Sequence, residues 1–127
     1  MGANDRRLRW IGTSLDDLRA FPPEVQSRMG FALRAAQEGS MDPDAKVLHG
    51  FGNAGVVEVA ERFARNAYRA VYTVRLEHSV YVLHVFQKKS KSGIATSTPD
   101  VDTIRRRLRE AEMLDAAVTA KQRGSNT

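Results

Sequence analysis

Basic residues gather in one short stretch of the chain, between positions 68 and 91. Residues 68–91 include five Lys or Arg and one acid, so this stretch carries +4 of the chain's net charge of +5. Such a concentration of positive charge on a short, rigid segment suits a site for a polyanion. The basic residues are Arg69, Arg75, Lys88, Lys89 and Lys91, and the acid is Glu77.

Side chains of these types can act on a phosphate, and one reaction that uses them is the cleavage of RNA without a metal ion. The ribose 2′-OH attacks the adjacent phosphorus and leaves a 2′,3′-cyclic phosphate, so the protein must remove one proton, stabilise charge on the phosphate oxygens and protonate the leaving 5′-oxygen. A planar, permanently charged Arg suits the phosphate oxygens, and a Lys whose pKa is lowered by neighbouring cations can exchange protons. Our catalytic candidates are Arg69, Lys88, Lys89 and His84.

Each candidate also has a simpler interpretation. Arg69 and the lysines can be solvated charges on a strand and at its end, and His84 can be a packed histidine with a satisfied hydrogen bond. The chain has no cysteine, and its three histidines show no ligand spacing. We therefore expect no metal site and no cofactor.

Two predicted strands position these residues. Alternation over 68–76 puts Arg69 on the more open face of the first strand, because the opposite face carries Tyr68, Ala70 and Tyr72. After a turn at 77–79, residues 80–87 are apolar on both faces, which is typical of an interior strand. Regular alternation would place His84 beside Val82 and Phe86, and would send Lys88 and Lys89 to opposite faces.

The remaining elements form the frame around these strands. Ser14 and Thr98 are predicted helix caps, Gly39 is a predicted helix end, and we expect regular structure to fray after Val118. The pattern predicts an α+β domain, a small antiparallel sheet with an N-terminal αα-hairpin and a C-terminal helix. We expect an edge strand at 8–11, helices at 14–21, 23–38 and 98–118, a loop at 40–55 and a strand at 56–60.

The segments YRAVYTV and VYVLHVFQKKSKSGI, followed by Thr-Pro and a helix with IRRRL, resemble the phage-derived branch of the RelE/HigB toxin family. The resemblance runs from about Leu8 to Met113. It implies a RelE-like fold and the toxin of a type II toxin–antitoxin pair, a hydrolase that cuts mRNA in the ribosomal A site and inhibits translation. It also implies a helix-turn-helix, HigA-like antitoxin as partner, together with the ribosome and mRNA.

The chain departs from this family at one position. Relatives carry an Arg shortly after a Glu in the strand before the hairpin, whereas Glu58-Val59 is followed here by Ala60. Arg62 is the candidate replacement. Because no acid–base pair is recognisable, a non-catalytic basic module that binds RNA or an acidic protein remains the alternative function.

Further RNA-binding candidates are Lys91, Arg62, Arg75, Arg105 and Arg106. The last two have a structural alternative, because acids on the same helix can pair with them at i,i+4 spacing. At 127 residues the chain is expected to be one domain, 1–127, with flexible ends at 1–7 and about 119–127. No apolar run approaches a membrane span and the N-terminus lacks the apolar core of a signal peptide, so we expect a cytoplasmic protein.

Overall fold

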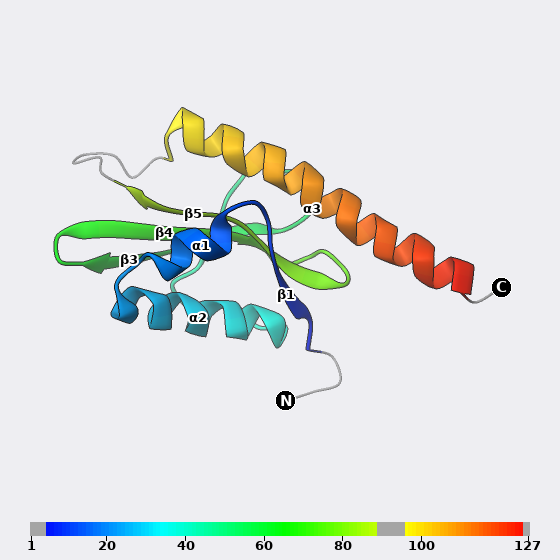
Figure 1. Cartoon of the computed structure of the whole chain (residues 1–127), viewed down its shortest axis with the longest axis horizontal. Helices are drawn as coiled ribbons and strands as arrows, with labels where there is room; N and C mark the ends of the chain where they lie inside the picture. Colours follow the sequence, from blue (N-terminus) through cyan, green and yellow to red (C-terminus); the bar gives the residue numbers. More distant parts are fainter. Residues whose placement is uncertain (1–4, 89–95, 126–127) are drawn as a thin grey trace.

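A five-stranded sheet with helices on both faces forms the protein (Figure 1). The computed structural model describes residues 5–88 and 96–125. The strands are β1 (Arg7–Trp10), β2 (Lys46–Val47), β3 (Val56–Phe63), β4 (Asn66–Thr73) and β5 (Ser79–Lys88), and the helices are α1 (Ser14–Arg19), α2 (Pro23–Gln37) and α3 (Thr98–Ser125).

The strand order is β1-β5-β4-β3-β2, so β5 lies in the interior of the sheet as predicted. The α+β class, the N-terminal helices and the C-terminal helix are confirmed, in an arrangement consistent with a RelE-like fold. The sheet is mixed, however, because β1 pairs parallel with β5 while the other pairs are antiparallel. The two-residue strand β2 is too short to show alternation, and we did not predict it.

The α2 face of the sheet is the apolar scaffold. The apolar stripe of α2, which includes Val25, Met29 and Leu33, is almost completely buried against β3, β4 and β5. Truncating a buried side chain such as Leu33 to Ala typically costs about 2–5 kcal/mol. Gly39 ends this helix as predicted: its φ is +84°, and the Ser40 N–H donates to the Ala35 carbonyl at 2.9 Å.

The opposite face of the sheet is covered by α3, whose Ile104, Leu108 and Ala111 pack on side chains from β4 and β5. This helix continues to Ser125, beyond Val118, where we expected regular structure to end. Its cap is Ser97 and not Thr98: the Asp100 N–H donates to Ser97 Oγ at 3.4 Å, and Ser97 Oγ donates to Asp100 Oδ2 at 2.6 Å.

The predicted cap of α1 is also wrong by one residue. Thr13 precedes the helix, and its hydroxyl donates to the Asp17 carboxylate at 2.8 Å. Ser14 is the first helical residue, and its buried hydroxyl donates to the Val82 carbonyl at 3.2 Å. Neither hydroxyl therefore caps the first N–H groups of α1, because both donate to other acceptors.

The β3–β4 hairpin closes through a tight turn in which Phe63 pairs with Asn66. Ala64 and Arg65 occupy the two central positions, with φ of +51° and +69°. A type I′ turn needs positive φ at both positions, where Asn-Gly is the favoured pair. The two turn residues therefore adopt a backbone conformation that side chains with Cβ disfavour.

A β-bulge interrupts the pairing of β4 with β5. Val71 lies opposite His84 and Tyr72 lies opposite Val82, so Leu83 has no opposite residue in β4. One inserted residue exchanges the faces of the strand beyond it. Val85 therefore joins Val80 and Val82 on the α2 side, and Phe86 lies on the α3 side. The prediction that His84 shares a face with Val82 is wrong, and its pairing with Phe86 is correct.

Candidate functional site

Strand register brings three cations to one face of the sheet. Residues directly opposite in an antiparallel pair share a face. Ala60, Arg69 and Phe86 form one row across β3, β4 and β5, and the next row is formed by residues 62, 67 and 88. Arg62, Arg69 and Lys88, which we call the cation cluster, therefore lie together on the α3 face near the β3–β4 hairpin. Ala60 and Ala67 lie in the same rows, and their short side chains leave space between the three cations.

Arg69 is held by a buried ion pair. Its Nη1 donates to Glu58 Oε1 at 2.5 Å, and the two side chains are 13% and 7% exposed. Glu58 Oε2 also accepts a 3.4 Å hydrogen bond from the Thr96 hydroxyl. The predicted face of Arg69 is correct, but the prediction that this face is open is wrong. Alternation indicates which side chains share a face, and it does not indicate what covers them.

Part of the Arg69 guanidinium has no protein ligand. The buried Nε atom lacks a hydrogen-bond partner among the described residues. A cavity of about 350 Å³ lies beside the ion pair, and its lining includes Lys46, Glu58, Ala60, Arg69 and Thr96. This volume is near the lower end of the range for ligand pockets. The cavity therefore has room for one small group, and a phosphate beside Arg69 would meet a planar donor.

Lys88 lies at the end of β5, next to Arg69 in the rows just described. Its burial, and then the positive charge of Arg69, lower the pKa of the Lys88 ammonium below its ordinary value. A lysine with a lowered pKa releases its proton more readily, which is the property that proton transfer to a leaving oxygen requires. Lys89 and Lys91 lie outside the described residues, and their roles stay predictions.

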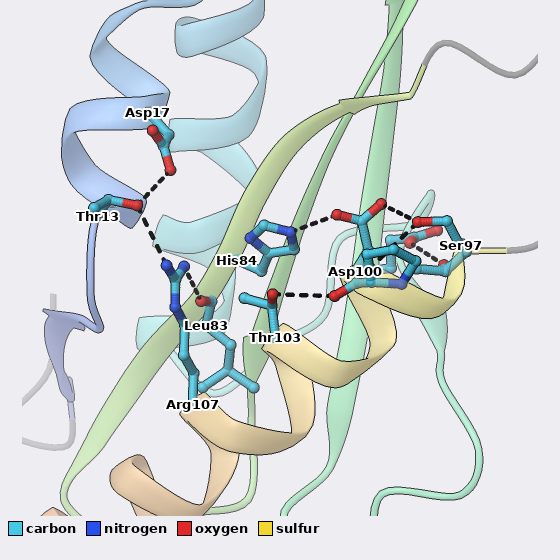
Figure 2. Close-up of polar contacts among 11 residues, drawn as sticks. Thr13, Asp17, Leu83, His84, Ser97, Asp100, Thr103 and Arg107 are labelled. Atoms are coloured by element: carbon cyan, nitrogen blue, oxygen red, sulfur yellow. Dashed lines mark hydrogen bonds and ion pairs between the residues drawn. The ribbon is translucent and has the colours of Figure 1, made fainter.

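His84 connects β5 to the first turn of α3 (Figure 2). Its Nε2 lies 2.8 Å from Asp100 Oδ1, and its ring stacks on Phe86 with a centroid distance of 4.5 Å. The side chain is 13% exposed, and the buried Nδ1 has no hydrogen-bond partner among the described residues. The hydrogen bond of Nε2 fits the interpretation of His84 as a packed histidine. The Nδ1 atom, which has no partner among the described residues, is compatible with a catalytic role.

Three other RNA-binding candidates lie outside the cluster. Arg75 follows the opposite end of β4, roughly 20 Å from Arg69 along the strand at 3.3 Å per residue. Arg105 Nη1 donates to the Gly50 carbonyl at 3.0 Å, and its guanidinium lies over Phe51; these contacts are structural, but they are with the loop before β3 and not with an acid of the same helix. Arg106 is exposed on α3. Contacts of these three residues with RNA stay predictions.

Sequence reasoning missed three residues of the site. Glu58 drew attention only as a family landmark, and Asp100 drew none. Arg107 was not among the candidates, yet its Nη1 donates to the Leu83 carbonyl at 3.0 Å and its Nη2 to Thr13 Oγ1 at 3.3 Å (Figure 2). None of these roles has a signal in local sequence, because each depends on a partner far along the chain.

The described residues contain neither a group of metal ligands nor a membrane-spanning helix. Within residues 5–88 and 96–125, no three His, Asp or Glu side chains are grouped as metal ligands would be. In the same part of the chain, no helix combines the length and the apolar character that crossing a bilayer requires.

The N-terminal helices, the five-stranded sheet and the C-terminal helix are consistent with a RelE-like fold. The family model described as phage-derived protein Gp49-like (DUF891) matches residues 16–109, which is most of the chain. The chain therefore belongs to the phage-derived Gp49-like family, as the resemblance predicted. No curated protein and no solved structure matches the chain.

Proposed function

We propose that this protein is the toxin of a type II toxin–antitoxin pair and that it cleaves mRNA on the ribosome. The observation that carries the proposal is the convergence of Arg62, Arg69 and Lys88 on one face, beside the His84–Asp100 pair. Membership of a toxin-like family supports the same class of function.

The geometry suggests a role for each group. Arg69 would stabilise the negative charge that develops on the phosphate oxygens, and Arg62 would hold a neighbouring phosphate. Lys88, with its lowered pKa, would protonate the leaving 5′-oxygen. His84 would accept the proton of the 2′-OH. Asp100 covers its Nε2 and Nδ1 is buried, so this step requires the first turn of α3 to move.

The same cations would serve the antitoxin. An acidic segment of a helix-turn-helix antitoxin would neutralise the cation cluster by charge complementarity and exclude RNA from it. We propose that both binding partners, the antitoxin and the translating ribosome, are met in the cytoplasm.

The test is induced expression in a bacterial host, with mapping of mRNA 5′ ends in the presence and absence of translating ribosomes. We expect growth arrest and new mRNA ends that appear only during translation. Strong expression that leaves both growth and translation unchanged would contradict the toxin assignment.

The catalytic residues are tested by Lys88→Ala, alone and with Lys89→Ala. Loss of one charged contact to the transition state should slow cleavage by about a hundredfold, equivalent to about 3 kcal/mol. Ribosome affinity should fall much less, because it is spread over many contacts. Arg19→Ala, which removes an exposed cation on α1, is the matched control and should cleave at the wild-type rate. Wild-type cleavage by the lysine variants would remove both residues from the active site.

A second function, a non-catalytic module that binds RNA or an acidic protein, is favoured by one observation. Glu58 neutralises Arg69 at close range, which weakens the attraction of this guanidinium for phosphate. Such a module would bind RNA with an affinity that falls steeply with salt through counterion release, and it would generate no mRNA ends. A flat salt response would count against any phosphate-binding site in the cation cluster.

A further inference from the structure

Two polar ties connect α3 to adjacent residues of β5. Asp100 Oδ1 is 2.8 Å from Nε2 of His84, and Arg107 Nη1 donates to the carbonyl of Leu83 at 3.0 Å. Figure 2 shows both ties on the same side of β5, with the His84 ring between them. The two tied residues are those at which the pairing of β5 with β4 shifts.

The second tie satisfies a carbonyl group at the bulge. Leu83 is the inserted residue, with no opposite residue in β4, and a buried carbonyl without a partner is costly. Arg107 supplies the donor, and its other terminal nitrogen donates to Thr13 Oγ1, whose own proton goes to Asp17. The guanidinium is therefore fixed on both sides, by the bulge and by the residue that precedes α1.

The chain before α1 is shaped around this guanidinium. Gly12 has φ of +58°, and a Cβ at this position would lie 2.8 Å from Arg107 Cζ. A glycine therefore meets two requirements here, a left-handed backbone and close approach to the Arg side chain. Burial, and then Arg106, lower the pKa of the Arg107 guanidinium, which still remains charged because its ordinary pKa is very high.

The bulge decides where His84 points. In a regular strand, positions 80, 82 and 84 would share a face, and Val80 and Val82 belong to the apolar cluster on the α2 side. The inserted Leu83 instead turns His84 to the α3 side, where Phe86 and Asp100 lie. Any group that stabilises the bulge therefore stabilises this placement of His84.

We propose that Arg107 is a positioning residue: by holding the Leu83 carbonyl it maintains the bulge and aims His84 at the candidate site. The effect of Arg107 on the orientation of His84 does not depend on what the protein does. Its consequence for cleavage rests on the proposed function.

The aiming is tested by NMR of the His84 ring in Arg107→Ala and Arg107→Lys, with Arg109→Ala as control, since Arg109 is an exposed cation on the same helix. We expect the His84 Cε1–Hε1 resonance to move and its contacts with Phe86 to weaken in Arg107→Ala, with partial recovery in Arg107→Lys and no change in Arg109→Ala. Thr13→Ala removes one of the two bonds of the guanidinium and should give a smaller shift, which keeps the test informative if Arg107→Ala does not fold. Unchanged His84 resonances in folded Arg107→Ala, or in Thr13→Ala if that variant alone folds, would overturn the proposal.

The consequence for cleavage is tested by a double-mutant cycle with His84→Ala. We expect Arg107→Ala to lower kcat about as much as His84→Ala, by tenfold or more, with little change in KM, and the double variant to be no slower than His84→Ala alone. Multiplying losses would overturn the coupling of Arg107 to His84. A wild-type protein that cleaves nothing would instead refute the proposed function, and the NMR result would still decide the aiming.

Discussion

Two buried ion pairs in this protein are built differently. On the scaffold side, Arg28 of α2 makes two bonds to Asp42, at 2.7 and 2.8 Å, and a third to Asp44 at 2.7 Å. At the candidate site, Arg69 makes one bond to Glu58, and its buried Nε has no partner among the described residues. The first arginine has its bonding capacity largely used within the protein, and the second does not.

The difference separates a structural role from a functional one. The Arg28–Asp42 pair ties the loop after α2 to the helix, and Asp42 is almost completely buried. Leaving a buried donor unpaired costs free energy in the unbound protein, so a functional reason is to be sought for it. A bound phosphate would supply hydrogen-bond acceptors to the Arg69 guanidinium, whose Nε has no partner among the described residues.

The largest effect is expected from Arg69→Ala. This variant leaves Glu58 buried without its partner, so the free energy of unfolding should fall by about 3–5 kcal/mol, and cleavage should be lost. The exposure expected from sequence would instead have predicted a change of about 0.5 kcal/mol or less. The measurements are urea unfolding of Arg69→Ala and mRNA cleavage by the same variant.

The matched control for this change is the double variant Glu58→Ala with Arg69→Ala. It removes both charges, so it should recover much of the stability while cleavage stays absent. A double variant that is stable and cleaves RNA would show that Arg69 serves only the fold.

Arg28→Ala should destabilise the protein by about 2–3 kcal/mol, because a buried carboxylate loses charge-assisted hydrogen bonds. Cleavage by the folded fraction should be unchanged, since Arg28 lies on the scaffold side. Loss of cleavage without loss of folded protein would break the division between the two ion pairs.

Acid should weaken the Arg28–Asp42 pair. Hydrogen bonds from Arg28 lower the pKa of the Asp42 carboxyl. A carboxyl with a lowered pKa in the folded state stabilises the fold above its ordinary pKa of about 4, and this contribution is lost as pH falls through the lowered value. Melting temperatures between about pH 5 and pH 2 should therefore fall more steeply for the wild-type protein than for Arg28→Ala. Parallel curves would contradict this assignment.

The smallest effect is expected at the hairpin tip beside the cation cluster. Ala64→Asn places a residue that tolerates positive φ at the first turn position, and it should stabilise the protein by about 1 kcal/mol in thermal or urea unfolding. Cleavage should be unchanged, because the charge of Arg65 is kept. Ala36→Asn, in a buried helical position, is the contrasting control and should destabilise.

Local patterns in the sequence determined much of this protein. The extent of α2 and its end at Gly39, the interior position of β5 and the face of Arg69 all follow from spacing and local residue chemistry. They were predictable because each depends on neighbours within a few positions along the chain. The concentration of basic residues gave the site candidates Arg69 and Lys88, which the strand register then brought to one face.

Only the tertiary structure decided what covers and aims these residues. Glu58 buries Arg69, the inserted Leu83 reverses the faces of β5 and turns His84 toward Asp100, and Arg107 satisfies the carbonyl that the bulge exposes. A period of two assigns faces only while the strand remains regular. The bulge is stabilised by a guanidinium twenty-four positions further along the chain, and no local pattern contains that contact.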